Sequence, residues 1–342
     1  MNENSRPRPP DWELSVCVPT HRRPQMLERA LRSVLSGNER LAPRIEVVVS
    51  DNGPEEGEPV FQRVATGWPG QIRYLAHRPG LGAIGNFNRC ISEATGRYLL
   101  ILHDDDYLLP GGLELILESL RGQDHCVVLF GVDVVDADGH VRRRQAFSRR
   151  TVLEPSVAMR RLLTESSFVR MPALVVRRDA YDVVGVYDPA VGNPTDFDLL
   201  VRLFARFGVA CEPATVAAYT VHDEAATESM FNEGVVQTLM TIFQRAAATN
   251  VLPRAIVRRT QADWFHQWIL GGTYRRLRAH DVAGARATMA LFSLPSVRAL
   301  GWSGRWRPIR LGFAIMVRLP DRVSSLLVDA ARRFESAIWA SW

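Results

Sequence analysis

The chain has 342 residues, 46% of them apolar and 23% charged, which is the composition of an ordinary globular protein with a substantial core. No apolar run approaches the roughly 20 residues that a membrane-spanning helix needs, so we exclude a transmembrane protein and expect a cytoplasmic one. Lysine is absent, and all 42 basic residues are arginine. This excludes Schiff-base chemistry and the lysine-dependent P-loop.

Charge divides the chain into two unlike parts. Residues 251–342 carry 15 arginines against 5 acidic residues, a net charge of +10, which leaves −5 for residues 1–250 given the total of +5. The four cysteines are widely scattered and show no paired metal-ligand spacing, so we interpret them as reduced and structural.

In chain order, the first 120 residues alternate short apolar strands with helices. The pattern predicts strands at 14–18, 45–49, 72–76 and 98–102, and helices at 25–35, 59–65 and 87–94. Such alternation is typical of right-handed βαβ units. We therefore expect an α/β fold with a doubly wound, mostly parallel sheet.

The fourth predicted strand ends in a run of acidic residues. Residues 98–110 read YLLILHDDDYLLP, so an apolar strand is followed at once by His103, Asp104, Asp105 and Asp106. Three adjacent carboxylates repel one another, and a divalent cation among them relieves that repulsion. Oxygen ligands suit Mg²⁺ or Mn²⁺. The alternative is a solvated acidic loop, which the buried strand directly before it makes less favourable.

A glycine-rich segment lies between the third strand and the third helix. Gly80, Gly82 and Gly85 form a G-x-G-x-x-G pattern, but it follows the third strand rather than the first. No acidic residue stands where a dinucleotide ribose contact would be. We interpret the segment as a turn in which the backbone approaches a ligand closely.

Further along the chain the predicted sheet becomes mixed. Strands are predicted at 126–135, 141–147 and 173–176, with helices at 155–163 and 199–207. Asp196 and Asp198 precede the last of these helices, where the helix dipole stabilises carboxylates. Asp198 is also four residues from Arg202, a spacing typical of a helical ion pair.

Four motifs in this order resemble the family 2 glycosyltransferases of the GT-A fold. They are PTHRRP at 19–24, SDNG at 50–53, GLGAIGNFN at 80–88 and HDDDYLLP at 103–110, and the similarity extends over about residues 13–222. The resemblance implies an NDP-sugar bound across the carboxyl edge of the sheet. It further implies that Pro19, Thr20 and Arg23 line the nucleotide pocket. Asp51 would accept a hydrogen bond from the nucleotide base, and Asn86 would help form the pocket floor.

The resemblance also assigns the acidic run. It implies a metal, Mn²⁺ or Mg²⁺, bound by Asp106 with Asp104 and His222, while Asp104 or Asp105 contacts the ribose. His103 stands where the family commonly has a first aspartate, so which aspartate touches the metal stays open. His222 has a structural role as its alternative, because Mg²⁺ prefers oxygen ligands.

By the same resemblance, Asp196 is the catalytic base of an inverting sugar transferase. Thr195-Asp196-Phe197 keeps the family's aspartate and aromatic residue but replaces its leading glutamate. The reaction would move a hexosyl or deoxyhexosyl group from an NDP-sugar to a glycan, a lipid-linked intermediate or a small molecule. The alternative function is a nucleotidyltransferase acting on sugar phosphates, but it would carry a glycine-rich basic loop after the first strand, and PTHRRP lacks glycine.

We expect three parts: a tail at 1–12, the catalytic domain at 13–222, and a helical region at 223–342. The last part holds six of the eight tryptophans and a stripe of apolar residues from Val323 to Ile338 at helical spacing. This region either packs on the catalytic domain or on a second subunit as a homodimer, or it contacts an anionic membrane surface on the inner face. No motif supports nucleic-acid binding.

Overall fold

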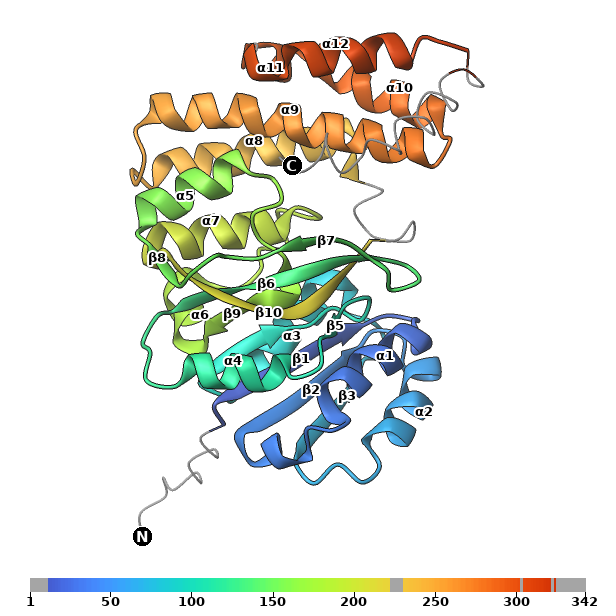
Figure 1. The fold of residues 1–342 in the computed structure, drawn as a ribbon, viewed down its shortest axis with the longest axis vertical. Helices are drawn as coiled ribbons and strands as arrows, with labels where there is room; N and C mark the ends of the chain where they lie inside the picture. Colours follow the sequence, from blue (N-terminus) through green and yellow to red (C-terminus); the bar gives the residue numbers. More distant parts are fainter. Residues whose placement is uncertain (1–11, 222–229, 302–303, 321–322, 324–342) are drawn as a thin grey trace.

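The computed structural model describes residues 12–221, 230–301, 304–320 and 323. A twisted sheet occupies the lower half of Figure 1, and layers of helices rise above it towards the C-terminal part of the chain. The N-terminal strands and helices lie at the end of the molecule opposite α10, α11 and α12. The chain thus forms an α/β unit with a helical extension.

The sheet is parallel on its N-terminal side and mixed beyond it. Its strand order is β3-β2-β1-β4-β9-β6-β10-β5, with β7 paired to β6 and β8 to β10. The strands are β1 (Leu14–Thr20), β2 (Ile45–Asp51), β3 (Gln71–Ala76), β4 (Tyr98–Ile101), β5 (Tyr107–Leu108), β6 (Val127–Asp136), β7 (Val141–Gln145), β8 (Thr151–Leu153), β9 (Leu174–Arg177) and β10 (Val209–Val221). β9 runs antiparallel to both β4 and β6, which makes the sheet mixed, as the sequence predicts.

Helices α1 to α7 cover the two faces of this sheet, and the remaining helices form the helical extension. They are α1 (Pro24–Leu35), α2 (Pro54–Ala65), α3 (Gly82–Glu93), α4 (Gly112–Leu120), α5 (Pro155–Thr164), α6 (Arg178–Val184), α7 (Thr195–Phe207), α8 (Glu233–Ala248), α9 (Arg254–Arg278), α10 (Val282–Ala290), α11 (Pro295–Arg298) and α12 (Arg307–Met316). Alternate residues of each strand enter different cores: Val16 and Val18 of β1 join the core beneath α1 and α4, whereas Cys17 joins the other. Burial on both faces explains the continuous apolar runs.

The helix starts differ most from the sequence prediction. α3 begins at Gly82 and α7 at Thr195, so Gly85 is helical, and the predicted glycine loop is wrong beyond Leu81. α2 begins at Pro54, where proline is tolerated at the first helical position, and it continues through Pro59. α4 and α6 were not predicted at all.

The helical extension shares a core with the sheet through α5 and α7. The ring of Phe197 on α7 stacks on that of Trp264 on α9, with ring centroids 5.0 Å apart. Trp264, Trp268 and Trp306 are buried in this core. Within the described ranges, no helix is long and apolar enough to cross a membrane. The predicted stripe from Val323 to Ile338 lies outside the described residues except for Val323 itself.

Candidate active site

The candidate site lies at the carboxyl edge of the parallel strands. β1 and β2 end side by side, with Thr20 and Asp51 as register partners, and β4 ends next to β1. The acidic run follows β4 directly, so it emerges at the same edge. In open α/β sheets ligands bind outside the carboxyl ends of the strands, and here three segments far apart in sequence meet there.

Asp104 is held by residues of the first motif. Its carboxylate accepts a hydrogen bond from Thr20 Oγ1 at 2.7 Å and one from Arg23 Nη1 at 3.3 Å. Arg23 Nη1 also contacts Asp105 Oδ2 at 3.3 Å. Burial raises the pKa of Asp104, although the hydrogen bond from Thr20 opposes the rise. Both Asp104 oxygens are thus engaged by the protein itself.

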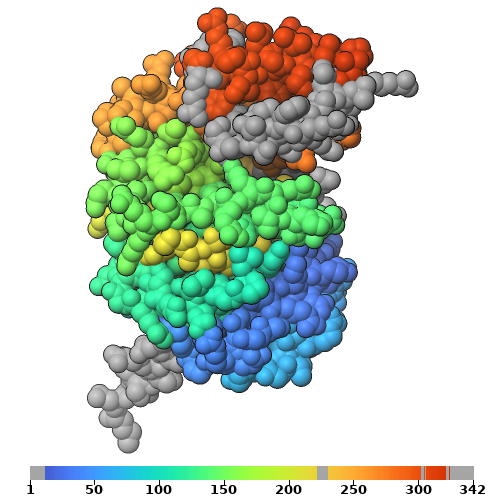
Figure 2. Space-filling model, viewed as in Figure 1, coloured from blue at the N-terminus to red at the C-terminus, as the bar shows by residue number. Residues whose placement is uncertain are grey.

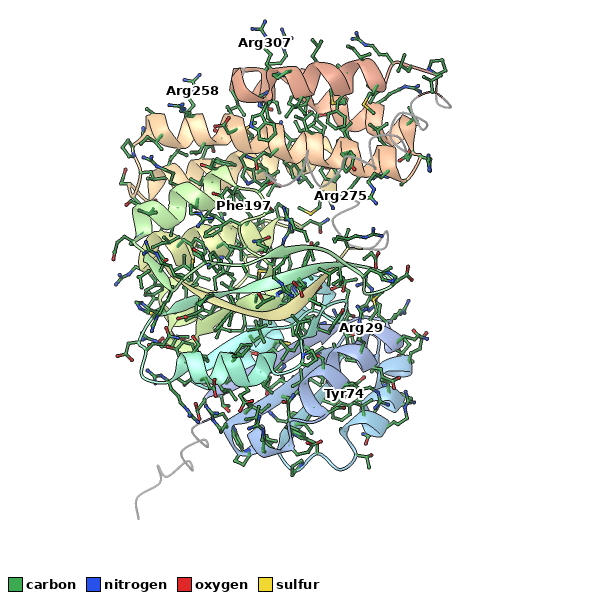
Figure 3. All side chains as sticks on the ribbon, in the orientation of Figure 1. Arg29, Tyr74, Phe197, Arg258, Arg275 and Arg307 are labelled. Carbon is green, nitrogen blue, oxygen red and sulfur yellow. The ribbon has the colours of Figure 1, made fainter. Side chains whose placement is uncertain are left out.

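Asp106 is buried and hydrogen-bonded to β10. The backbone N–H of Thr220 donates to Asp106 Oδ1 at 2.8 Å. Burial, with the charge of Asp105, raises the pKa of Asp106 to about 7. Arg29 on α1, labelled in Figure 3, donates to the Asp105 carbonyl oxygen at 2.5 Å and to Thr220 Oγ1 at 3.2 Å. These hydrogen bonds join the three segments.

Three side chains of the acidic run could hold a divalent cation. His103, Asp105 and Asp106 each offer a ligand atom, and these atoms lie within 4.8 Å of one another. Nε2 of His103 is buried with no hydrogen-bond partner in the described part of the chain, although such an atom normally has one. Two carboxylates and an imidazole fit a metal such as Mn²⁺. A second group of this kind, on the exposed β6–β7 hairpin, includes Asp136, which is ion-paired with Arg142.

Asp196 faces the acidic run from α7. Its Oδ1 is buried and has no hydrogen-bond partner among the residues described. Burial raises the pKa of Asp196, while the nearby His103 opposes the rise. Burial would lower the pKa of His103, but the negative charges of Asp196 and of the acidic run outweigh it, so that pKa is raised. The two side chains therefore form an electrostatic pair at the sheet edge.

Asp198, two residues further along α7, has a different environment. Its Oδ2 accepts from Arg202 Nε at 2.9 Å and its Oδ1 from Arg245 Nη1 at 2.8 Å, and the side chain is completely buried. The ion pair predicted from the four-residue spacing is confirmed. Arg245 belongs to α8, so Asp198 attaches the helical extension to α7. Both carboxylate oxygens of Asp198 already accept hydrogen bonds, so neither is left for a substrate.

The donor-side candidates cluster around the ends of β1 and β2. Asp51 Oδ1 accepts from the backbone N–H of Gly53 at 2.8 Å, and its Oδ2 accepts from the hydroxyl of Tyr74 at 2.6 Å. A Cβ atom on Gly57 would lie 2.0 Å from Asp51 Oδ2, which explains a glycine inside α2. Asn86 Nδ2 donates to the Thr20 carbonyl oxygen at 3.0 Å. Its own Oδ1 is buried without a partner in the described ranges.

The structure brings most of the predicted site residues to one edge. Pro19 is the penultimate residue of β1, beside Thr20. His222 lies outside the described residues, so its predicted role stays a prediction. Sequence reasoning did not single out Arg29 or Tyr74, and it noted His103 only as a departure from the family. Arg29 and Tyr74 lie inside a helix and a strand and reach the site only through the fold, so no local signal marks them.

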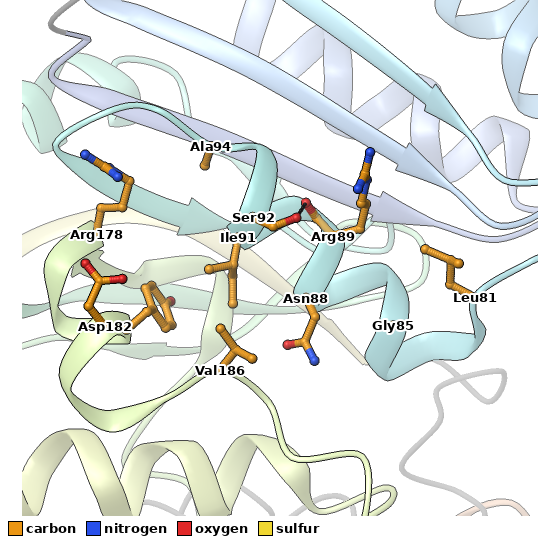
Figure 4. Close-up of a pocket in the computed structure, with 11 residues that line it drawn as sticks. Leu81, Gly85, Asn88, Arg89, Ile91, Ser92, Ala94, Arg178, Asp182 and Val186 are labelled. Atoms are coloured by element: carbon orange, nitrogen blue, oxygen red, sulfur yellow. Dashed lines mark hydrogen bonds between the residues drawn. The ribbon is translucent and has the colours of Figure 1, made fainter. Parts of the chain in front are cut away.

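A separate hollow lies between α3 and α6. It has a volume of about 610 Å³, and its lining includes Asn88, Ile91, Arg178, Tyr181 and Val186 (Figure 4). None of the residues predicted to bind the donor or the metal or to act as the base lines it, although Gly85 of the glycine-rich segment does.

The comparisons with known proteins identify the class of enzyme to which this chain belongs. The sequence profile described as "Glycosyl transferase family 2" matches residues 15–185, half of the chain. The chain belongs to this family and is a glycosyltransferase, as the resemblance implies.

Among curated proteins, one relative is a glucosyltransferase of Campylobacter jejuni named GalNAc(5)-diNAcBac-PP-undecaprenol beta-1,3-glucosyltransferase. It is 29% identical over 134 residues, which cover 38% of this chain and 41% of the relative. Because the match spans less than half of that protein, its activity as a whole does not transfer to this chain.

Solved structures show the fold. TarS 1-349 of S. aureus superposes with a TM-score of 0.57 at 15% identity, covering 94% of this chain and 91% of that one, and TarS has also been solved with UDP and with UDP-GlcNAc. Mannosyltransferase PcManGT of Pyrobaculum calidifontis, in complex with GDP-Man and Mn²⁺, superposes with a TM-score of 0.55 at 16% identity, covering 97% and 88%. The predicted GT-A type architecture, with a helical extension, is confirmed.

Proposed function

We propose that this glycosyltransferase moves a sugar from an NDP-sugar to an acceptor hydroxyl with inversion at the anomeric carbon, assisted by a divalent metal. The observation that carries the proposal is the buried, unpartnered carboxylate oxygen of Asp196, facing the acidic run across the sheet edge. A polar atom left unpaired in a protein interior is costly, and a substrate hydroxyl would satisfy it.

In the proposed donor complex the nucleotide lies over Pro19, Thr20, Arg23, Asp51 and Asn86. Asn86 Oδ1 is available as an acceptor, and Arg23 provides a positive charge at the acidic run. Asp104 or Asp105 contacts the ribose, and Asp104 lies beside Thr20 of the proposed nucleotide pocket, whose hydroxyl donates to it. Two structural neighbours were solved in complex with UDP-GlcNAc and with GDP-Man, which supports this donor class.

We assign the metal to Asp106 and Asp105, with His103 as the third candidate ligand. The sequence also predicts His222 and Asp104 as ligands. The closeness of the ligand atoms of His103, Asp105 and Asp106 supports this choice. Bound there, Mn²⁺ or Mg²⁺ would neutralise the negative charge that develops on the departing diphosphate. PcManGT, a structural neighbour, was solved with Mn²⁺.

Asp196 acts as the general base. As the acceptor oxygen forms a bond to the anomeric carbon, its proton passes to Asp196, and the bond from that carbon to the diphosphate oxygen breaks with the electron pair leaving on the diphosphate. The attack comes from the face opposite the leaving group, which inverts the configuration. The negative charges of Asp196 and of the acidic run raise the pKa of His103, and a cation bound among these carboxylates would offset the same charges.

The acceptor is a glycan, a lipid-linked intermediate or a small molecule. The undecaprenol-linked acceptor in the name of the Campylobacter jejuni relative favours a lipid-linked one. We further propose that residues 13–222 form the catalytic domain and residues 223–342 a helical region on the acceptor side. The alternative nucleotidyltransferase reading gains no support from the family match.

The test is a panel of NDP-sugars, each followed by thermal shift with and without Mn²⁺ on the wild-type chain. We expect at least one donor to raise the melting temperature only when Mn²⁺ is present. The product made from that donor should have the opposite anomeric configuration by NMR. Retention of configuration would contradict the assignment of Asp196, because a base acting on an acceptor hydroxyl gives inversion.

A further inference from the structure

The outermost helix of the extension carries an exposed apolar stripe. On α12, Leu311 is 62% and Ile315 is 53% exposed, although both are large aliphatic side chains. Arg307 is the first residue of α12 and precedes Leu311 by four residues. Arg318 lies in the turn after α12 and follows Ile315 by three residues, and both arginines are exposed. Residues at such spacings share one face of a helix. These four residues form what we call the α12 stripe.

The opposite face of α12 holds the helix on the molecule. Phe313 and Val317 are buried, and the guanidinium of Arg310 lies 3.9 Å from the ring centre of Phe292. The stripe is therefore directed outward. Figures 1 and 2 show α12 at the end of the molecule far from β1 to β3. Since α12 is anchored by its other face, the outward aliphatic side chains are not needed for its packing.

The charged residues of the segment that carries the stripe have a single sign. Residues 282–320 contain six arginines and no aspartate or glutamate. Arg258 of α9 lies next to this segment, since its Nη2 is 3.4 Å from the Ala299 carbonyl oxygen. Arg258 and Arg307 both point away from the body of the molecule (Figure 3). A surface of arginines with aliphatic side chains between them is complementary to negatively charged groups above an apolar layer.

We propose that the α12 stripe docks the enzyme on an anionic lipid surface, with Leu311 and Ile315 entering the interfacial layer and the arginines contacting lipid headgroups. This surface is distinct from the candidate active site and does not depend on the assignments made there. A second copy of the chain would fit the aliphatic residues, but two such surfaces facing each other would bring their arginines together without acidic partners from residues 282–320.

The experiment is co-sedimentation of the full chain with vesicles of equal parts phosphatidylglycerol and phosphatidylcholine, and with phosphatidylcholine alone. We expect wild type to bind the anionic vesicles at low salt and to be released at high salt. Leu311→Ser with Ile315→Ser should weaken binding by about tenfold for each side chain. Arg307→Glu with Arg318→Glu should weaken it by more than about 25-fold, since each basic residue near the surface contributes roughly fivefold.

Matched controls use exposed residues elsewhere. Val141→Ser with Val183→Ser removes two exposed valines, and Arg121→Glu with Arg160→Glu makes the same change in net charge as the arginine variant. Both controls should bind vesicles nearly as wild type does, and all variants should keep the wild-type melting temperature. The proposal is overturned if wild type stays in the supernatant at low salt, or if the stripe variants bind as tightly as the controls. A dimer in light scattering that Leu311→Ser with Ile315→Ser makes monomeric would also overturn it, because the stripe would then be a subunit interface.

Discussion

Carboxylates at the two edges of the same sheet have pKa values shifted in opposite directions. At the carboxyl edge, Asp106 and Asp196 are held with raised pKa values, and Asp196 keeps an oxygen without a partner in the described ranges. At the other edge, near the start of β2, Glu46 is buried to a similar degree. Its pKa is lowered, although burial alone would raise it.

The difference comes from how many donors the protein supplies. Glu46 Oε1 accepts from Ser15 Oγ at 2.6 Å, from Thr95 Oγ1 at 2.9 Å and from the backbone N–H of Gly96 at 3.1 Å, and Arg73 Nη2 lies 3.0 Å from Oε2. Such a carboxylate joins β1, β2 and the segment before β4 as a complete structural unit. At the carboxyl edge, by contrast, some buried polar atoms have no hydrogen-bond partner in the described part of the chain. A binding site needs such atoms, because the ligand supplies their partners.

The largest effect that follows from this contrast is on turnover. Asp196→Asn should reduce the rate of transfer by about 10²–10⁴ while donor affinity stays within a few fold, because it removes a base and leaves the donor side intact. Steady-state kinetics measures the rate of transfer, and titration calorimetry measures the donor affinity. Asp198→Asn is the comparison: it breaks ion pairs to Arg202 and Arg245 and should lower the melting temperature. A normal rate in Asp196→Asn would move the base elsewhere.

At the opposite edge the expected effect is on stability. Glu46→Gln should cost about 2–4 kcal/mol of the free energy of unfolding at neutral pH, because it leaves the Arg73 charge and several buried donors poorly matched. Since the pKa of Glu46 is lowered on folding, its contribution is present above the unfolded value and is lost as the pH falls through the folded one. Denaturant unfolding from pH 7 down to about pH 3 should show wild type and variant converging. A constant difference would contradict this account.

A third effect concerns Asp106, and its sign is opposite. Because folding raises the pKa of Asp106 to about 7, ionisation of this group destabilises the metal-free protein as the pH rises from its unfolded value of about 4 towards 7. Metal-free Asp106→Asn should therefore be at least as stable as wild type at pH 8, and should lose its advantage at low pH. Melting temperatures in a chelator measure this difference. A variant less stable than wild type at pH 8 would show that the carboxylate is structural.

Much of this architecture is predictable from local patterns. The apolar runs ending at Thr20, Asp51 and the acidic run predict parallel strands and put polar residues at their common edge, as observed. The acidic run is recognisable from its position at the end of an apolar strand, and Asp196 from a family motif that is contiguous in sequence. Strand positions were accurate because burial on both faces leaves an unbroken apolar signal.

The features that the sequence does not predict depend on contacts between segments that are far apart in the chain. The pairing of β9 between β4 and β6, antiparallel to both, has no local signature. Helix starts were misplaced at Gly82 and Thr195 because glycine and threonine there are compatible with either a loop or a first turn. The distinction between Asp196 and Asp198 also needs three dimensions, since it is Arg245 on α8 that engages Asp198.

The most direct test of the contrast between the edges is Mn²⁺-dependent binding of the NDP-sugar panel to wild type, Asp106→Asn and Glu46→Gln. It is measured by titration calorimetry at a temperature where all three remain folded. We predict that Glu46→Gln binds the donor with the wild-type dependence on Mn²⁺, although it is less stable, and that Asp106→Asn loses this dependence. Unchanged Mn²⁺ dependence in Asp106→Asn, or its loss in Glu46→Gln, would contradict the assignment of the carboxyl edge as the site and of the other edge as structure.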